Sequence, residues 1–72
     1  MAYATSVSVK SVRVPRPFYR YAGFVRVADA DGRTWTLPMP GTVAQWLLPG
    51  QRLHLELQDP DSVTFENYRL KG

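Results

Sequence analysis

The chain has 72 residues, no cysteine, one histidine and a formal net charge of +3 at pH 7. This length predicts one domain, spanning residues 1–72, near the lower limit at which a single hydrophobic core holds a fold. The missing cysteines exclude disulfide bonds, cysteine-ligated zinc and thiol chemistry, and a lone histidine cannot build a metal site by itself.

Residues 5–14 alternate apolar and polar side chains, which predicts a half-buried β-strand. The first two valines of this stretch share one parity and the last two share the other, so the alternation shifts at Lys10–Ser11. A β-bulge there would restore the pattern and bend the strand, as a small closed barrel requires. The alternative is a strand whose first half lies at a sheet edge.

Pro15 and Pro17 end this strand, because proline lacks an N–H group and restricts the residue before it. A second strand is predicted from Tyr19 to Ala28, and its alternation places Phe24 and Arg26 on the outer face. Gly23, in the middle of this strand, indicates a bend or a close backbone approach.

The Asp31–Gly32 pair between two runs rich in aromatic and β-branched residues predicts a hairpin turn. The third strand is expected from Arg33 to Leu37, with Trp35 facing inward and Pro38 ending the strand.

Residues 42–48 predict a short helix, with Thr42 as its N-cap and Pro49–Gly50 as its end. Val43, Trp46 and Leu47 have helical spacing, so we expect them to face inward as a lid over one end of a barrel.

The fourth strand has the clearest alternation in the chain, with Leu53, Leu55 and Leu57 on the inner face. Residues 59–62 form a turn by composition, and the fifth strand is predicted from Val63 to Leu70.

The predicted order is therefore strand, strand, strand, short helix, strand, strand. This order matches the OB-fold, an all-β, five-stranded Greek-key barrel that commonly carries a helix between strands three and four and often binds oligonucleotides or oligosaccharides. An SH3-like barrel is the alternative, although its helical turn usually falls between strands four and five.

Positive charge is concentrated in the first half of the chain. Residues 1–33 carry six basic and two acidic side chains, a net of +4, whereas residues 34–72 carry three basic and four acidic ones, a net of −1. Such asymmetry indicates a polyanionic partner, with an ordinary solvated surface as the alternative.

Proteins that bind single-stranded nucleic acid combine a basic groove with exposed aromatic rings on which bases stack. We therefore predict a non-enzymatic protein that binds single-stranded DNA or RNA with little sequence preference. Its arginines would neutralise phosphates and its aromatic rings would stack on bases. The candidate residues are Arg16, Phe18, Tyr19, Arg20, Phe24, Arg26 and Arg33.

Aromatic residues also have a structural interpretation, because a small barrel needs large side chains to fill its core. We expect Tyr21, Trp35, Trp46 and Phe65 to be buried, and Phe18 and Phe24 to be exposed. Trp35 is also a weaker stacking candidate.

The sequence predicts no catalytic residues, metal site or cofactor. His54 and Glu56 share the outer face of the fourth strand, but no nucleophile or third group converges on them. Asp29 and Asp31 resemble the start of a calcium loop that lacks its later ligands, so we interpret them as turn residues.

A protein-interaction module is the alternative function. A viral or plasmid-encoded protein that docks on and regulates a larger host or virion complex would have similar features, and a homodimer is also possible for so short a chain. The chain has neither a signal-peptide pattern nor a long apolar run, so we expect a cytoplasmic protein without a membrane partner.

Overall fold

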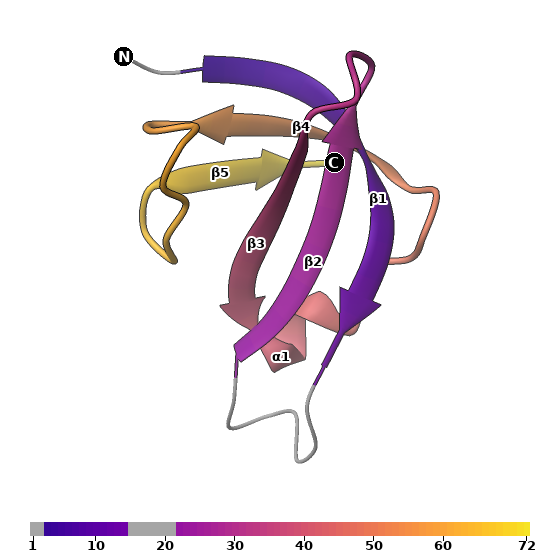
Figure 1. Ribbon diagram of the computed structural model, residues 1–72. Helices are drawn as coiled ribbons and strands as arrows, with labels where there is room; N and C mark the ends of the chain where they lie inside the picture. Colours follow the sequence, from indigo (N-terminus) through magenta and orange to yellow (C-terminus); the bar gives the residue numbers. More distant parts are fainter. Residues whose placement is uncertain (1–2, 15–21) are drawn as a thin grey trace.

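A computed structural model describes residues 3–14 and 22–72. Its strands form one antiparallel sheet in the order β3-β2-β1-β4-β5. The elements, in chain order, are β1 (Tyr3–Arg13), β2 (Ala22–Asp29), β3 (Thr34–Pro40), α1 (Gly41–Ala44), β4 (Arg52–Leu57) and β5 (Tyr68–Lys71). The sheet curls strongly, so that β4 and β5 run across the direction of β1, β2 and β3 (Figure 1).

This topology is that of an OB-like barrel, as predicted, with the short helix between β3 and β4. The helix position distinguishes the fold from the SH3-like alternative. Among the described residues no backbone ladder joins β3 to β5, so the sheet is a curled half-barrel with these two strands at its edges.

The predicted bulge in β1 is confirmed. The register of β1 against β2 shifts between Val9 and Ser11, which leaves Lys10 as the extra residue. Residues 3–8 of β1 pair with β4, and residues 7–13 pair with β2. The bulge bends β1, so that a single strand serves both halves of the curled sheet.

The core lies on the concave side of the sheet and is built from one face of each of the first four strands. Its fully buried aliphatic side chains each contribute roughly 1.5–3 kcal/mol to the free energy of unfolding. The predicted inward face of β4 is confirmed, since all three of its leucines are buried. The largest fully buried side chains are Val9, Val25, Val27, Leu37, Leu55 and Leu57.

The predicted turn between β2 and β3 is also confirmed. The Asp29 carboxylate accepts backbone N–H bonds from Asp31 and Arg33, at 3.0 and 2.9 Å. Gly32 has a φ of +85°, a backbone conformation that glycine adopts without steric cost. In the loop between β4 and β5, the Asp59 carboxylate accepts a bond from the Asp61 N–H at 3.0 Å.

The third strand does not stop at Pro38 as predicted, but continues to Pro40. Pro38 pairs with Phe24 of β2, and its carbonyl accepts a bond from the Tyr68 hydroxyl on the other side. Because the N–H and C=O of a strand residue point to the same side, the missing N–H of Pro38 faces the sheet edge and costs no ladder bond.

The predicted short helix is present, but the predictions for its N-cap and its buried face are wrong. Helix α1 covers only Gly41–Ala44, its N-cap is Pro40 without a side-chain bond, and its buried residues are Gly41 and Ala44. Val43 and Trp46 are exposed. The sheet backbone comes so close at this point that only small side chains fit between it and α1.

The fifth strand is shorter than predicted, beginning at Tyr68 rather than Val63. The Asn67 side chain accepts a bond from the Thr64 N–H at 2.7 Å and donates one to the Ser62 carbonyl. These bonds hold residues 62–67 in a compact loop, because they occupy backbone groups that a strand would need.

The predicted start of the second strand, at Tyr19, lies outside the described residues. In the described part of the chain, no helix has the length and apolar content needed to cross a membrane.

Candidate nucleic-acid interface

The candidate site lies on the outer, convex face of β1, β2 and β3, and Phe24 is at its centre. In the sheet register, Phe24 lies between Arg13 of β1 and Pro38 of β3. The Phe24 side chain is 44 % exposed, which leaves part of its ring available to a ligand. The prediction that Phe24 is exposed is therefore confirmed.

The next row of the same face has Arg26 at its centre, flanked by Ser11 of β1 and Thr36 of β3. All three of these side chains are exposed. Together with Arg13 and Phe24 they line a shallow hollow of about 370 Å³. The hollow thus combines an aromatic ring, two guanidinium groups and two hydroxyl groups, without a carboxylate.

Arg13 is a site residue that the sequence analysis missed. It lies opposite Phe24 because the bulge at Lys10 changes the parity of β1. Without the extra residue, Arg13 would share the parity of the buried Val7 and Val9. The shift in alternation at Lys10–Ser11 could have predicted this position. If Lys10 is counted as the extra residue of a bulge, the alternation places Arg13 on the outer face.

The predicted site residues have different outcomes. Phe24 and Arg26 lie together on the outer face, whereas Arg33 lies after the turn at the far end of the β2–β3 hairpin. The Arg33 guanidinium carbon is 5.8 Å from the centre of the Tyr3 ring, and the guanidinium donates a 3.5 Å hydrogen bond to the Tyr3 hydroxyl. The other four predicted residues, Arg16, Phe18, Tyr19 and Arg20, lie outside the described residues.

The tryptophans differ from each other in exposure. Trp35 is 8 % exposed, packs 6.0 Å from the Tyr3 ring and donates its indole N–H to the Pro60 carbonyl at 3.2 Å. This confirms its predicted core position and removes it as a stacking candidate. Trp46 and Phe65, which were predicted to be buried, are instead exposed, and Tyr21 lies outside the described residues.

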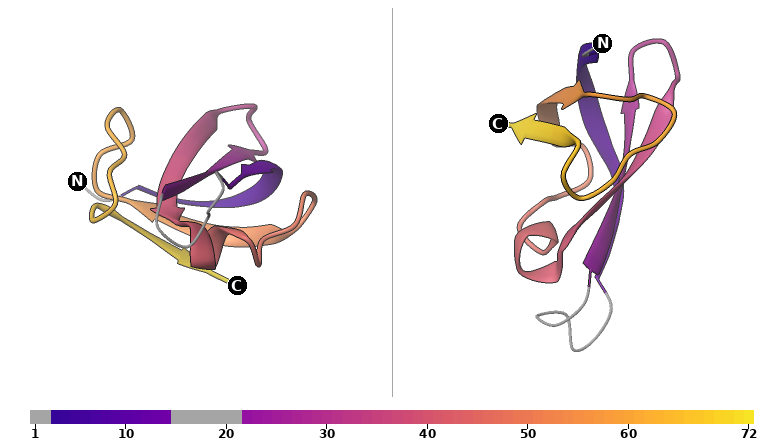
Figure 2. Two further views of the ribbon diagram at one scale, coloured as in Figure 1. Left: turned by 90° about the horizontal axis from the view of Figure 1, so that it is seen from below. Right: turned by 90° about the vertical axis from the view of Figure 1, so that its left-hand side faces the viewer.

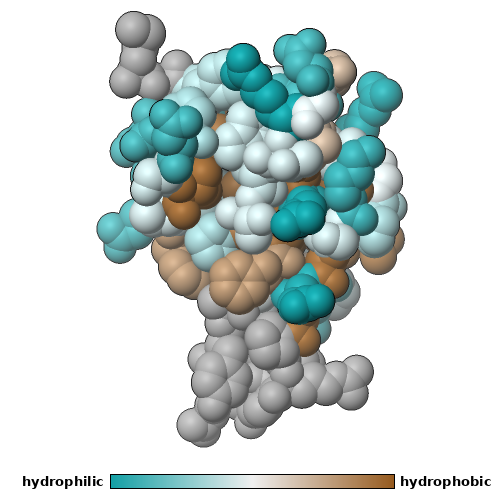
Figure 3. Space-filling view, viewed as in Figure 1, coloured by the Kyte–Doolittle hydropathy of each residue, from teal (hydrophilic) through white to brown (hydrophobic). Residues whose placement is uncertain are grey.

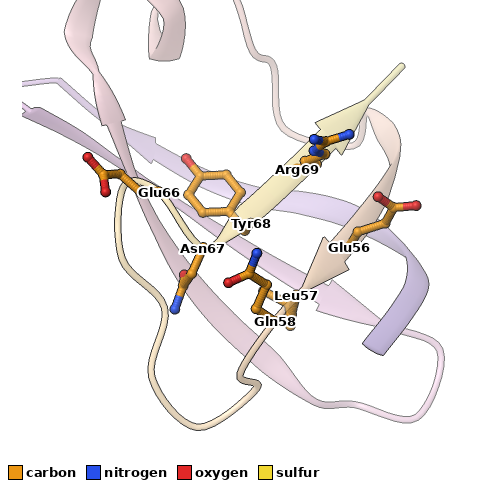
Figure 4. A pocket seen from close by; sticks show the side chains of 7 residues that line it. All are labelled: Glu56, Leu57, Gln58, Glu66, Asn67, Tyr68 and Arg69. Atoms are coloured by element: carbon orange, nitrogen blue, oxygen red, sulfur yellow. The ribbon is translucent and has the colours of Figure 1, made fainter. Parts of the chain in front are cut away.

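The β4–β5 hairpin carries a separate hollow of about 260 Å³ (Figure 4). Glu56 faces Arg69 across the two strands, and Glu66 lies on the other side of the hollow. Two carboxylates against one guanidinium would repel phosphate, so the hairpin is less suited to nucleic acid than the β1–β3 face.

His54, beside Glu56, was the residue that the sequence analysis considered for acid–base chemistry. His54 lies between Ser6 of β1 and Lys71 of β5 on the outer face of the sheet. Across residues 3–14 and 22–72, no three histidine, aspartate or glutamate side chains gather as metal ligands.

Comparisons with protein-family models, curated proteins and solved structures found no match for this chain, so the function of the β1–β3 face is inferred from its chemistry alone.

Proposed function

We propose that this protein binds single-stranded DNA or RNA with little sequence preference and has no enzymatic activity. The observation that supports the proposal is the exposed Phe24 ring, which lies beside Arg13 and near Arg26 on a sheet face without acidic side chains. We also propose that the protein acts in the cytoplasm.

In the proposed mechanism, one base stacks on Phe24 while Arg13 and Arg26 neutralise phosphates on either side. Base stacking on an aromatic ring contributes about 1–3 kcal/mol and is tolerant of sequence, because every base has a π-face. Ser11 and Thr36 line the same hollow, and their hydroxyl groups would donate hydrogen bonds to the backbone of the nucleic acid. Roles for Arg16, Phe18, Tyr19, Arg20 and Arg33 stay predictions from the sequence.

The test is a titration of the protein into a labelled mixed-sequence single strand of about 20 nucleotides, at low and moderate salt, followed by fluorescence anisotropy. We expect Phe24→Ala to weaken binding about tenfold, since it removes the stacking platform. The matched control is Phe65→Ala, which removes a ring of similar exposure from a different surface and should leave nucleic-acid binding unchanged.

Salt dependence supplies a second readout. Log affinity falls as log salt rises, and replacement of Arg13 or Arg26 by glutamine should make this slope less steep by about 0.7 per lost phosphate contact. Arg52→Gln, on β4, is the control and should keep the wild-type slope. Absence of binding at low salt would refute the proposal. If Phe24→Ala lowered the melting temperature as strongly as the affinity, the ring would be structural.

A further inference from the structure

A second surface of the molecule lies at the open side of the half-barrel, between the edge strands β3 and β5 (Figure 2). A hollow of about 450 Å³ lies there, and we call it the seam groove. Its lining is mainly apolar and includes Met39, Val43, Leu47, Phe65, Tyr68 and Leu70. The space-filling view shows brown apolar atoms gathered in the lower half of the described surface, whereas teal and white atoms predominate above (Figure 3).

Large apolar side chains are unusually exposed around this groove. Phe65 and Val43, which line it, are each 52 % exposed. Trp46 is 76 % exposed and Leu48 is also exposed, and they are the chain neighbours of the groove residue Leu47. Contiguous exposed apolar patches mark interaction sites, and tryptophan is enriched among the residues that dominate binding energy.

Both walls of the seam groove are unpaired strand edges. Within residues 3–14 and 22–72, β3 pairs only with β2, and β5 pairs only with β4. The hydrogen bond of 2.6 Å from the Tyr68 hydroxyl to the Pro38 carbonyl links the two walls at the start of β5. Beyond it, no strand of the described part of the chain pairs with the outer edge of β5, so its backbone groups could pair with an added strand.

The two faces of β5 specify what an added strand should carry. Tyr68 and Leu70 line the groove, whereas Arg69 and Lys71 are exposed on the opposite face. Residues that face each other across two strands lie on the same side of the sheet. A strand added to β5 would therefore place apolar residues over the groove and its alternate residues opposite Arg69 and Lys71. An acidic residue opposite Lys71 would complement its charge, because Lys71 faces His54 on β4, whereas Arg69 already faces Glu56.

The same charges disfavour a second copy of this chain as the occupant. Suppose that two copies paired their β5 strands antiparallel, with both apolar faces on one side of the sheet. Arg69 and Lys71 of one copy would then lie opposite Arg69 and Lys71 of the other. Like charges directly opposite each other destabilise a strand pair. On β4, Glu56 faces Arg69 and His54 faces Lys71, so no carboxylate lies opposite Lys71.

We propose that the seam groove binds an extended segment of another protein, in which apolar residues alternate with aspartate or glutamate, by strand addition to β5. Because β5 has four residues, we expect about four to six residues of the bound segment to pair with it. This surface is separate from the Phe24 hollow and shares none of its lining residues, so the protein could hold a nucleic-acid strand and a protein partner together.

The probe is a blocked peptide of about eight alternating glutamate and valine residues, added to the full-length protein. Binding is followed by tryptophan emission and by backbone amide shifts in the isotope-labelled protein. We expect the shifts to lie in β5 and around the groove. A lysine–valine peptide should bind at least about tenfold more weakly, because of its charge. The same weakening is expected for a glutamate–valine peptide that is methylated at alternate backbone nitrogens. This peptide lacks the N–H groups that a strand needs to pair with a sheet edge.

Two protein variants separate this proposal from nucleic-acid binding. Phe65→Ala should weaken peptide binding without affecting the labelled single strand, and Phe24→Ala should do the reverse. A variant with both Arg69→Glu and Lys71→Glu should prefer the lysine–valine peptide. Because all four of these positions are exposed, each variant is expected to fold.

The proposal is overturned if the wild-type protein does not bind the glutamate–valine peptide, if the lysine–valine peptide binds equally well, or if the amide shifts lie away from β5. It is also overturned if the protein forms dimers that are lost in Phe65→Ala but kept in the variant with Arg69→Glu and Lys71→Glu. A second copy of the chain would then cover the groove. Each outcome is independent of the result with the single strand.

Discussion

Gly23 of β2 lies where α1 meets the sheet. A Cβ atom at this position would stand 2.8 Å from the Ala44 Cβ and 3.2 Å from the Arg13 carbonyl oxygen. Ala44 is itself fully buried, whereas its larger neighbour Val43 is exposed. The size of two small residues therefore sets the position of α1, and the larger side chains of this segment lie outside the contact.

We expect Gly23→Ala to lower the free energy of unfolding by about 1–3 kcal/mol, because the added methyl group has no room. Chemical denaturation measures this loss. In an Ala44→Gly background the same substitution should cost less, since the shortest contact is gone, and the difference between the two backgrounds gives the coupling energy. Equal stability of Gly23→Ala and the wild type would contradict the close approach.

At the scale of elements, the two edge strands are linked by one side chain. The Tyr68 hydroxyl of β5 donates to the Pro38 carbonyl of β3 at 2.6 Å. Desolvation by burial raises the pKa of Tyr68 above its ordinary value. The folded state therefore keeps the phenol proton at a pH where the unfolded chain has begun to release it.

This difference makes the fold sensitive to alkali. Between the unfolded pKa of about 10 and the raised folded pKa, the folded state binds more protons, so the free energy of unfolding falls as pH rises. Below about pH 10 the contribution is fully present. Tyr68→Phe should remove this part of the pH dependence and lower stability at neutral pH by about 0.5–1.5 kcal/mol, through the lost bond. Urea unfolding from pH 8 to pH 11 would measure both effects. An unchanged slope in Tyr68→Phe would assign the alkaline effect to other groups.

At the scale of the whole molecule, β1 holds the two halves of the curled sheet together. It pairs with β2 on one side and β4 on the other, and it contributes Val7 and Val9 to the core. Among the residues that the structure describes, β3 and β5 are each paired on one side only. The structure therefore has a doubly paired centre and two edges that face each other across the seam groove.

Hydrogen exchange should reflect this arrangement. We expect the slowest amide exchange in β1 and its two neighbours, because opening them disrupts most of the core, and faster exchange in the four residues of β5. Exchange measured by NMR at single-residue resolution provides the test. If the β5 amides were as protected as those of β1, β5 would have a second strand partner in solution, as in a closed barrel or a strand-paired dimer.

Part of the site followed from local pattern alone. The alternation of the second strand placed Phe24 and Arg26 on the outer face, and the structure confirms their exposure. Arg13 was not predicted, because its place beside Phe24 depends on the bulge and on the pairing of β1 with β2. Arg33 could not be assigned from sequence either, since its contact with Tyr3 joins residues 30 positions apart.

The sequence by itself determined the order of the elements, the bulge at Lys10, the inward face of β4 and the turn around Gly32. These features depend on side-chain alternation and on backbone conformations that only a few residues favour. Tertiary structure alone decided that the Trp46 and Phe65 rings are exposed, because burial depends on the space that other elements leave. Trp35 is enclosed under the Pro60 loop, whereas the close approach of α1 to β2 leaves Trp46 in solvent. It likewise decided that Pro38 lies within a strand, because only the pairing of β3 shows which of its sides is an edge.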